Sequence, residues 1–145
     1  NRWFVFGTKI TDLRIYNLAL DRIISVEPCE APYYENQEFD SEHFFDDVIG
    51  VSKKLHDIPR CVRFWANAEQ SKYIKTKPLH PLQKLENENQ EDGSCIFQIE
   101  VCINFEMYSV FMSYGPGVKI IYPHFAVSYM KERLKEAAAL YDTKE

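Results

Sequence analysis

Residues 60–78, RCVRFWANAEQSKYIKTKP, decide how the C-terminal part of this chain folds. The first seven residues alternate, which indicates a β-strand with one buried face. The side expected to face a core carries Val62, Phe64 and Ala66. Asn67 and Gln70 then have the spacing of a capping box, which starts a helix, and Pro78 cannot continue that helix. The stretch therefore predicts a strand followed at once by a helix.

The next residues predict a hairpin and a second helix. Residues 83–88 and 94–104 flank the acidic tip QEDG, and the second arm alternates in the manner of a half-buried strand. The positions expected to face inward are Cys95, Phe97, Ile99, Val101 and Ile103. Asn104 is a suitable N-cap for the helix that follows, and Gly115 is a suitable end. That helix is expected to bury Phe105, Tyr108 and Phe111.

The C-terminal residues complete an α+β pattern. Residues 118–122 predict a strand, and Pro123 opens a final helix. Its expected inner stripe is Val127, Met130, Leu134, Ala137, Ala138 and Tyr141. The order strand, helix, strand, strand, helix, strand, helix over residues 59–145 predicts a ferredoxin-like βαββαβ sandwich with an extra C-terminal helix.

The N-terminal part predicts two strands. Residues 2–9 are aromatic and β-branched, and residues 13–26 form a longer, mostly apolar run interrupted by Asp21 and Arg22. One face of the longer strand would carry Arg14, Tyr16, Leu18, Leu20, Arg22, Ile24 and Val26. On a straight strand its two arginines would lie about 26 Å apart, too far to hold one small ligand, so only a bend would bring them together.

Residues 29–58 are interpreted as an acidic linker with a short helix, capped by Asp40 or Ser41 and ended by Gly50. The helix is expected to carry Phe44, Phe45 and Val48. Charge changes sign along this part of the chain: residues 23–52 hold eight acidic residues and no Lys or Arg, whereas residues 53–84 hold eight Lys or Arg and two acidic residues. This segregation fits either a solvated helix face or a groove for an anionic ligand, and both stay open.

Composition limits the protein class. The chain has 145 residues, 46% of them hydrophobic, which suffices for one compact domain and a fragment of another. No apolar run approaches the roughly 20 residues that span a membrane, and the start at Asn1 suggests a piece of a longer protein. A net charge of −5 argues against a surface that binds phosphate backbone all round.

No enzyme template is found in the sequence. The four histidines, at 43, 56, 80 and 124, never fall at HxxxH or HExxH spacing, and neither a GxSxG motif nor a P-loop is present. The cysteines at 29, 61, 95 and 102 form no CxxC pair, so reduced thiols are expected rather than a disulfide framework or a metal site. The expectation is a protein that is not an enzyme and has no cofactor.

Two residue types leave alternatives open. Arg22 either forms an ion pair, with Asp21 of a neighbouring chain or with Glu27, or remains available for a phosphate or carboxylate. The same choice applies to Arg14. His80, in the stretch PLHPLQ at 78–83, is either a loop histidine bonded to backbone or a ligand-binding residue.

The chain resembles a known bacterial module. RWFVFG at 2–7 and LRIYNLALDRIISVEP at 13–28 are similar to the second half of a WYL domain, with Trp3-Phe4-Val5 in place of the Trp-Tyr-Leu triplet. VRF at 62–64, PLHPLQ, SYGPGVKIIYP at 113–123 and a terminal helix ending at Tyr141 resemble WCX, the C-terminal extension that usually follows a WYL domain.

The resemblance implies a fold and a function. Residues 1–28 would be the last strands of an Sm-like or SH3-like barrel, and the whole protein a cytoplasmic bacterial transcription regulator, commonly dimeric, with an upstream winged-helix domain that binds DNA. Its effector would be single-stranded nucleic acid or a nucleotide-like ligand. The residues expected to bind it are Arg14, Arg22, Tyr16, Trp3, Arg63 and His80.

The chain also departs from the family pattern. Phe-Val replaces Tyr-Leu, and the earlier barrel strands and the DNA-binding domain are absent from this sequence. An incomplete barrel would expose a sheet edge, so either another chain or further residues are expected to complete it. Two other functions remain possible: a small-molecule sensor with no nucleic-acid ligand, and a dimerisation module with no ligand at all.

Overall fold

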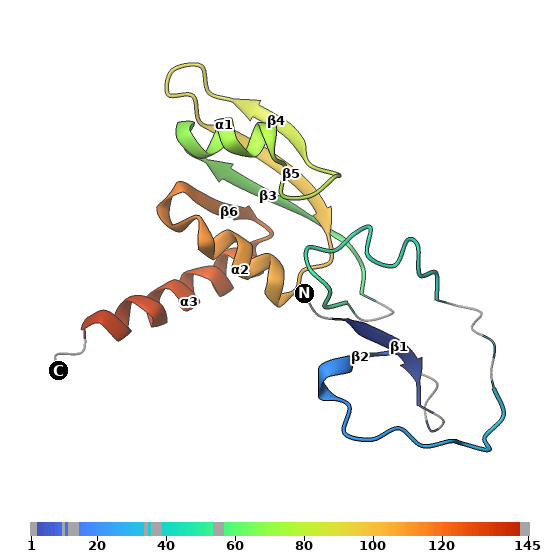
Figure 1. Ribbon diagram of the computed structural model, residues 1–145. Helices are drawn as coiled ribbons and strands as arrows, with labels where there is room; N and C mark the ends of the chain where they lie inside the picture. Colours follow the sequence, from blue (N-terminus) through green and yellow to red (C-terminus); the bar gives the residue numbers. More distant parts are fainter. Residues whose placement is uncertain are drawn as a thin grey trace. The chain divides into compact units, whose positions relative to one another are not determined.

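The computed structural model describes residues 3–9, 11, 15–33, 35, 39–53 and 57–142 (Figure 1). The chain divides into two compact units, each described by itself. The N-terminal unit comprises Asn1–Phe44 and Lys54–Asp57, and the C-terminal unit comprises Phe45–Lys53 and Ile58–Glu145. Among the described helices, none is both long and apolar enough to cross a membrane.

The C-terminal unit has the predicted α+β fold. A four-stranded antiparallel sheet has the order β4-β5-β3-β6, and three helices accompany it. The strands are β3 (Arg60–Ala66), β4 (Lys84–Glu88), β5 (Cys95–Val101) and β6 (Val118–Tyr122); the helices are α1 (Ala68–Thr76), α2 (Phe105–Ser113) and α3 (His124–Asp142). The first strand therefore lies inside the sheet beside the third, which is the ferredoxin-like βαββαβ topology, and α3 is the predicted extra helix.

Local signals start both short helices as the sequence predicts. The Asn67 side chain accepts a hydrogen bond from the Gln70 N–H at 2.9 Å, and Asn104 does the same for the Met107 N–H at 2.7 Å. Each bond satisfies one of the free N–H groups in the first turn of a helix. After α2 the chain enters a 3-10 turn, η2 (Gly115–Gly117), and Gly115 has a φ of +52°, a conformation that favours glycine.

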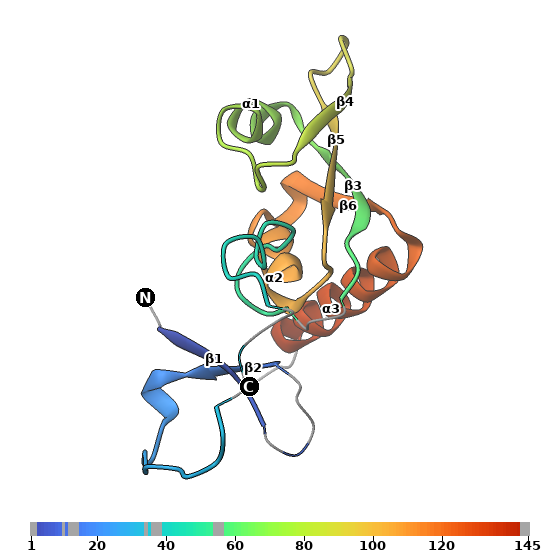
Figure 2. The ribbon, with the colours of Figure 1, turned by 90° about the vertical axis from the view of Figure 1, so that its right-hand side faces the viewer.

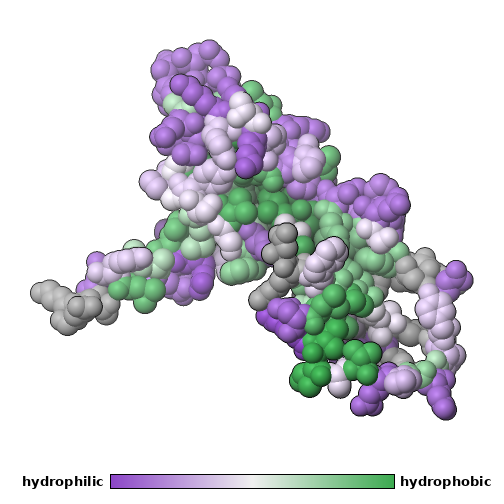
Figure 3. All heavy atoms as spheres, viewed as in Figure 1, coloured by the Kyte–Doolittle hydropathy of each residue, from purple (hydrophilic) through white to green (hydrophobic). Residues whose placement is uncertain are grey.

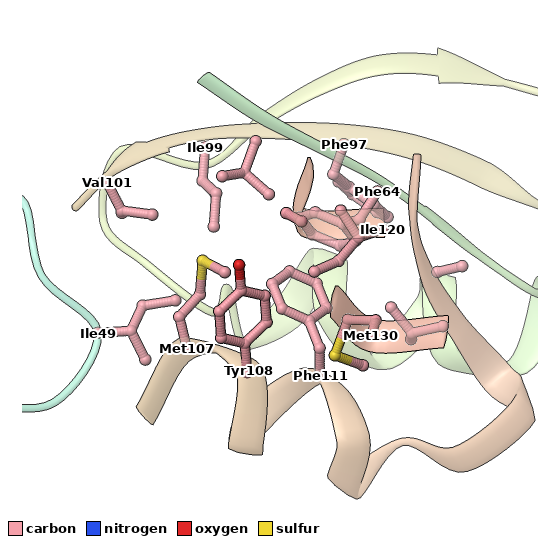
Figure 4. Packing of buried hydrophobic residues seen from close by; sticks show 14 of the residues in the cluster. Ile49, Phe64, Phe97, Ile99, Val101, Met107, Tyr108, Phe111, Ile120 and Met130 are labelled. Carbon is pink, nitrogen blue, oxygen red and sulfur yellow. The ribbon is translucent and has the colours of Figure 1, made fainter. Parts of the chain in front are cut away.

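The core lies on one face of the sheet. Figure 2 shows α1 and α2 on the same side of the strands, and Figure 4 shows the side chains between them. Phe64 stacks on Phe97 at 5.4 Å between ring centroids, and Phe111 of α2 meets Phe64 edge-on at 5.1 Å. The three rings are almost fully buried, and burial of each contributes about 1.5–3 kcal/mol to stability. By contrast Phe105, expected in this core, is 69% exposed.

Only the first half of α3 packs as expected. Ala126 and Met130 are buried, whereas Leu134 is 46% and Tyr141 91% exposed. The predicted inner stripe is therefore wrong beyond Met130. A helix of 19 residues is about 28 Å long, while a five-residue strand spans about 17 Å, so the end of α3 extends past the sheet on which it packs (Figure 1).

The N-terminal unit contains a hairpin. Strands β1 (Phe4–Thr8) and β2 (Ile15–Ala19) pair antiparallel, from Phe4 opposite Ala19 to Thr8 opposite Ile15. The predicted strand 13–26 is too long, because the chain leaves the sheet in a 3-10 turn, η1 (Leu20–Arg22). On one side of the hairpin the Phe6 ring stacks on Phe39 at 5.1 Å and meets Phe44 edge-on at 5.7 Å.

The short helix expected after Asp40 is a series of turns instead. The Asp40 carboxylate accepts hydrogen bonds from the N–H groups of Glu42 and His43, at 3.0 and 3.3 Å. An aspartate bonded to the backbone two residues ahead forms an Asx turn, which competes with a helix for the same N–H groups. Gly50, the expected helix end, has a φ of +90°.

Candidate functional site

One face of the β1–β2 hairpin is open to solvent. Paired residues share a face in an antiparallel sheet, so Val5 with Leu18 and Gly7 with Tyr16 lie on the side opposite Phe6. Val5 and Leu18 are nearly half exposed, and Trp3, two residues before Val5, is 79% exposed. Figure 3 shows hydrophobic atoms gathered over this hairpin. We call Trp3, Val5, Tyr16 and Leu18, with the flanking Lys9 and Arg22, the hairpin surface.

The structure brings Trp3 and Arg22 to the same end of the hairpin surface. The Leu20 N–H donates to the Trp3 carbonyl at 3.0 Å, which holds η1 against the start of β1. Arg22, two residues further along the same turn, is exposed. None of the described residues of this chain forms an ion pair with Arg22, so Glu27 does not occupy its guanidinium, and a pair with Asp21 of a neighbouring chain stays a prediction.

The other end of the hairpin surface also combines a cation with an aromatic ring. The Lys9 ammonium lies 4.3 Å from the centre of the Tyr16 ring. Gly7, opposite Tyr16, has no atom within 4 Å of the place where a Cβ would stand, so the neighbouring surface is open. Ala19, which is paired with Phe4 next to Trp3, marks the first end of the hairpin surface. Tyr16 lies three positions from Ala19, so the two ends are about 10 Å apart along the strand. The predicted Arg14 lies outside the described residues.

A second open surface lies on the C-terminal unit, on the side of the sheet away from the core. Trp65 is paired with Lys119, and Arg63 with Tyr122 across a register shift in β3 and β6. Because Val62, Phe64 and Ala66 face the core, Arg63 and Trp65 face the other way. We call Arg63, Trp65, Lys119 and Tyr122 the open sheet face.

The cations of the open sheet face already have partners. Arg63 donates two hydrogen bonds to the Glu86 carboxylate, from Nε at 2.6 Å and from Nη2, and this interaction raises the pKa of Arg63. The Lys119 ammonium lies 5.0 Å from the centre of the Trp65 ring. An exposed cation over a ring contributes about 0.5–1 kcal/mol, less than the roughly 1–3 kcal/mol of a stacked nucleobase, so Lys119 does not close the ring to a ligand.

Part of the open sheet face was outside the predicted site. Only Arg63 was predicted to bind ligand, although strand alternation already places Trp65 beside it on the outer face. The alternation of residues 118–122 also predicts that Lys119 lies on the outer face of its strand. Tyr122 is 44% exposed, and it faces outward because of the register shift, which has no sequence signal.

His80 is a buried residue rather than a surface one. Its side chain is only 4% exposed, and its Nδ1 accepts a hydrogen bond from the Leu82 N–H at 3.2 Å. Burial lowers the pKa of His80, although a hydrogen bond with the backbone of Asp46 opposes this. The loop interpretation accounts for these contacts, and a ligand role for His80 stays a prediction.

Residues 45–53, which we call the tether segment, dock on the start of α2. The Cys102 N–H donates to the Asp47 carbonyl at 2.7 Å, and the Cys102 thiol lies 3.6 Å from the Asp47 carboxylate. The Asn104 amide donates to the carbonyls of Ile49 and Ser52, at 2.9 and 3.0 Å. Asn104 therefore caps α2 and fixes the tether segment, and only the first role is visible in the sequence.

Glu106 completes the attachment of the tether segment. Its Oε1 accepts hydrogen bonds from the Val51 N–H at 3.3 Å and the Ser52 hydroxyl at 2.8 Å. Its Oε2 is buried, with no hydrogen-bond partner among the described residues. Lys53 pairs with the Asp47 carboxylate at 2.6 Å, which closes the segment on itself.

A pocket of about 280 Å³ lies between α2 and α3. It is lined by Phe105, Tyr108, Ser109, Met112, Tyr129 and Arg133. The Tyr108 and Tyr129 rings lie 4.2 Å apart, and burial raises the pKa of Tyr108. Arg133 at the rim is paired with Glu136 at 2.9 Å. This volume is at the lower end for small-molecule sites.

No metal centre is found in the described part of the chain, where no group of three or more His, Cys, Asp or Glu side chains converges. All four cysteines are free thiols: Cys95 and Cys102 are buried, Cys61 is half-buried and Cys29 is exposed.

Comparison with known proteins places the chain in a family. No curated protein matches the sequence. Among solved structures it is similar to proteasome accessory factor B/C (PafBC) of Arthrobacter aurescens, with 16% identity and a TM-score of 0.47 over 99% of this chain. This chain covers 21% of the PafBC chain. The WCX domain profile matches residues 59–138, from the start of β3 into α3, so the chain belongs to the WCX domain family.

Proposed function

We propose that this chain is the effector-sensing region of a bacterial WYL-type transcription regulator. The single observation that carries the proposal is the WCX match over residues 59–138, which fits the WYL-like sequence of residues 1–28 that precedes it. The effector is an anionic ligand, single-stranded nucleic acid or a nucleotide-like molecule. The regulator would act in the cytoplasm, as a homodimer, and contact DNA through a winged-helix domain outside this chain.

The hairpin surface supports an anionic ligand with a flat ring. Arg22 presents a guanidinium that no described carboxylate occupies, and such a fork binds phosphate through two parallel hydrogen bonds. Trp3, at the same end, offers an exposed indole on which a base can stack. Lys9 and Tyr16 repeat the combination about 10 Å further along.

A binding titration tests this proposal. A fluorescein-labelled single-stranded oligonucleotide is titrated into the full chain, and anisotropy gives the dissociation constant. Arg22→Ala is expected to weaken binding about tenfold or more, because a hydrogen bond to a charged group is lost. Lys72→Ala, which removes an exposed positive charge from α1, serves as the matched control and is expected to bind as the wild type does.

Circular dichroism of Arg22→Ala separates binding from folding. A folded variant with weaker binding supports the proposal. Equal affinity of the wild type and Arg22→Ala contradicts it, as does a variant that unfolds, because unfolding would mean that Arg22 has a structural role.

The pocket between α2 and α3 favours a second candidate, a small-molecule sensor. Three aromatic rings and Met112 provide an apolar lining, and Arg133 provides one cation at the rim. A small aromatic carboxylate fits this chemistry. Binding to such a pocket would change little with salt and would be lost in Tyr108→Ala, whereas oligonucleotide binding falls steeply with salt. Thermal-shift measurements with a set of aromatic acids distinguish the two.

A further inference from the structure

We propose that the open sheet face is a second binding surface for single-stranded nucleic acid, with bases stacking on Trp65 and Tyr122 and phosphates held by Lys119 and Arg63. The proposal rests on the proposed function for its ligand class. It concerns a different unit from the hairpin surface. The two surfaces can therefore be tested separately.

The open sheet face lies on the inner strand β3 and its neighbour β6, on the side of the sheet opposite the core. Trp65 lies on β3 and Tyr122 on the adjacent edge strand β6, two paired strands of one antiparallel sheet. Because Tyr122 is paired with Arg63, it is a diagonal neighbour of Trp65, and diagonal neighbours on paired strands stand about 7–8 Å apart, close to the spacing of neighbouring unstacked bases. Trp65 is partly buried and Tyr122 is 44% exposed. Aromatic side chains on the open face of a four-stranded sheet can stack splayed bases, because a flat surface lets the backbone of a single nucleic-acid strand run across it.

Charge on this face complements a phosphate backbone. Lys119 stands between Trp65 and solvent, and a base that stacks on Trp65 displaces the ammonium toward the phosphate of that nucleotide. Arg63 is held in place by Glu86 through Nε and Nη2, so its charge is compensated and Nη1 is the one terminal nitrogen that does not bond to this carboxylate. The aromatic rings thus alternate with cations: Trp65 is paired with Lys119, and Tyr122 with Arg63.

The lining of the face also favours an extended single strand over a duplex. Ile96 and Gln98 of β5 are paired with Trp65 and Arg63 and extend the surface across the sheet. Bases in a duplex are stacked on each other and cannot reach Trp65, whereas bases of a single strand can. A duplex of the same sequence is therefore expected to bind more weakly.

The test uses the tryptophans of the full chain. The sequence has two, Trp3 and Trp65, so in Trp3→Phe all tryptophan emission comes from Trp65. An unlabelled single-stranded oligonucleotide is titrated into this variant, and stacking is expected to quench the emission. In the wild-type background, Trp65→Leu is expected to weaken binding about fivefold or more. Lys119→Gln is expected to reduce the slope of log K against log salt by about 0.7, the value for one phosphate contact on a single strand.

Two matched controls remove the same groups elsewhere. Tyr141→Leu changes an aromatic ring on α3 that is 91% exposed, and Lys131→Gln removes an exposed charge on the same helix. Both are expected to bind as the wild type does. Since Lys119 is exposed, Lys119→Gln remains informative even if Trp65→Leu fails to fold.

The outcomes separate this proposal from the proposed function. Quenching of Trp65, together with weaker binding or a smaller salt slope in the sheet variants, supports the open sheet face. Unchanged Trp65 emission at saturation, or wild-type binding by both sheet variants, overturns it, even where Arg22→Ala still weakens binding. Loss of affinity in the sheet variants alone, with Arg22→Ala unaffected, keeps the open sheet face and rejects the hairpin surface. No oligonucleotide binding at all overturns both.

Discussion

At the scale of single residues, two arginines show how surroundings select a role. Arg63 is gripped through two nitrogens by Glu86, so it can offer only its remaining nitrogen to a ligand. Arg22 has no ion-pair partner among the described residues and lies at the same end of the hairpin as the exposed Trp3. Sequence alone does not distinguish the two residues, yet within the described residues Arg63 has a carboxylate partner and Arg22 has none.

His80 gives a pH-dependent prediction at the same scale. Burial lowers the pKa of His80 below its ordinary value of 6.5, so on acidification the unfolded state takes up a proton before the folded state does. The stability that this residue contributes is therefore complete above about pH 6.5 and falls as the pH drops toward and through the folded pKa, by at most about 1.4 kcal/mol per pH unit.

The free energy of unfolding of wild type and His80→Asn, measured by urea at a series of pH values, checks this. The asparagine side chain keeps an acceptor for the Leu82 N–H but does not titrate. His80→Asn is expected to lose less stability than the wild type on acidification. Parallel pH profiles for wild type and His80→Asn would show that His80 does not titrate in this range.

At the scale of elements, the tether segment depends on one glycine. Gly50 has a φ of +90°, and a Cβ there would lie 2.7 Å from the Glu106 Cβ and Cγ. Gly50→Ala combines backbone strain with overpacking, so we expect a loss of about 2–4 kcal/mol in the free energy of unfolding.

Gly115→Ala is the matched control for this prediction. Gly115 also has a positive φ, +52°, but no atom lies within 4 Å of its Cβ position. We therefore expect only the strain cost, about 1–2 kcal/mol. Chemical denaturation measures both variants, and equal losses would mean that contact between Gly50 and Glu106 does not hold the tether segment.

The two halves of α3 give a further prediction. Met130 is 8% exposed and belongs to the core, whereas Leu140 is 76% exposed. Met130→Ala should cost about 2–5 kcal/mol of unfolding free energy, and Leu140→Ala less than about 0.5 kcal/mol. Thermal unfolding of the two variants measures these losses of stability. A large loss in Leu140→Ala would show that the end of α3 is covered by another surface.

Sequence reasoning succeeded where the determining contacts are local. The caps at Asn67 and Asn104 depend on residues three positions away, and strand alternation over residues 95–101 follows from a single buried face. It failed where distant residues decide. Asp47 meets Cys102 across 55 positions, and no pattern near Asp47 indicates this contact. The outward position of Arg63 follows from the alternation of its own strand, whereas the positions of Lys9 and Tyr122 depend on a turn and on a register shift between β3 and β6.

At the scale of the whole molecule, the net charge differs in sign from the local charge of the two proposed surfaces. The net charge of −5 means that the protein as a whole does not attract nucleic acid from a distance. In the proposed function, binding depends on two local surfaces, each with two aromatic rings and two cations: the hairpin surface of the N-terminal unit and the open sheet face of the C-terminal unit. Such surfaces bind through short-range contacts that salt can weaken.

The most direct test of the account is the salt dependence of oligonucleotide binding by the full chain. The dissociation constant of a fluorescein-labelled single strand is measured over a series of salt concentrations. With Arg22 and Lys9 each neutralising one phosphate, the account predicts that the logarithm of the association constant, the inverse of this dissociation constant, falls with log salt with a slope of about −1.4 or steeper. A slope near zero, or no binding at the lowest salt, would contradict the claim that this region senses a single-stranded nucleic acid.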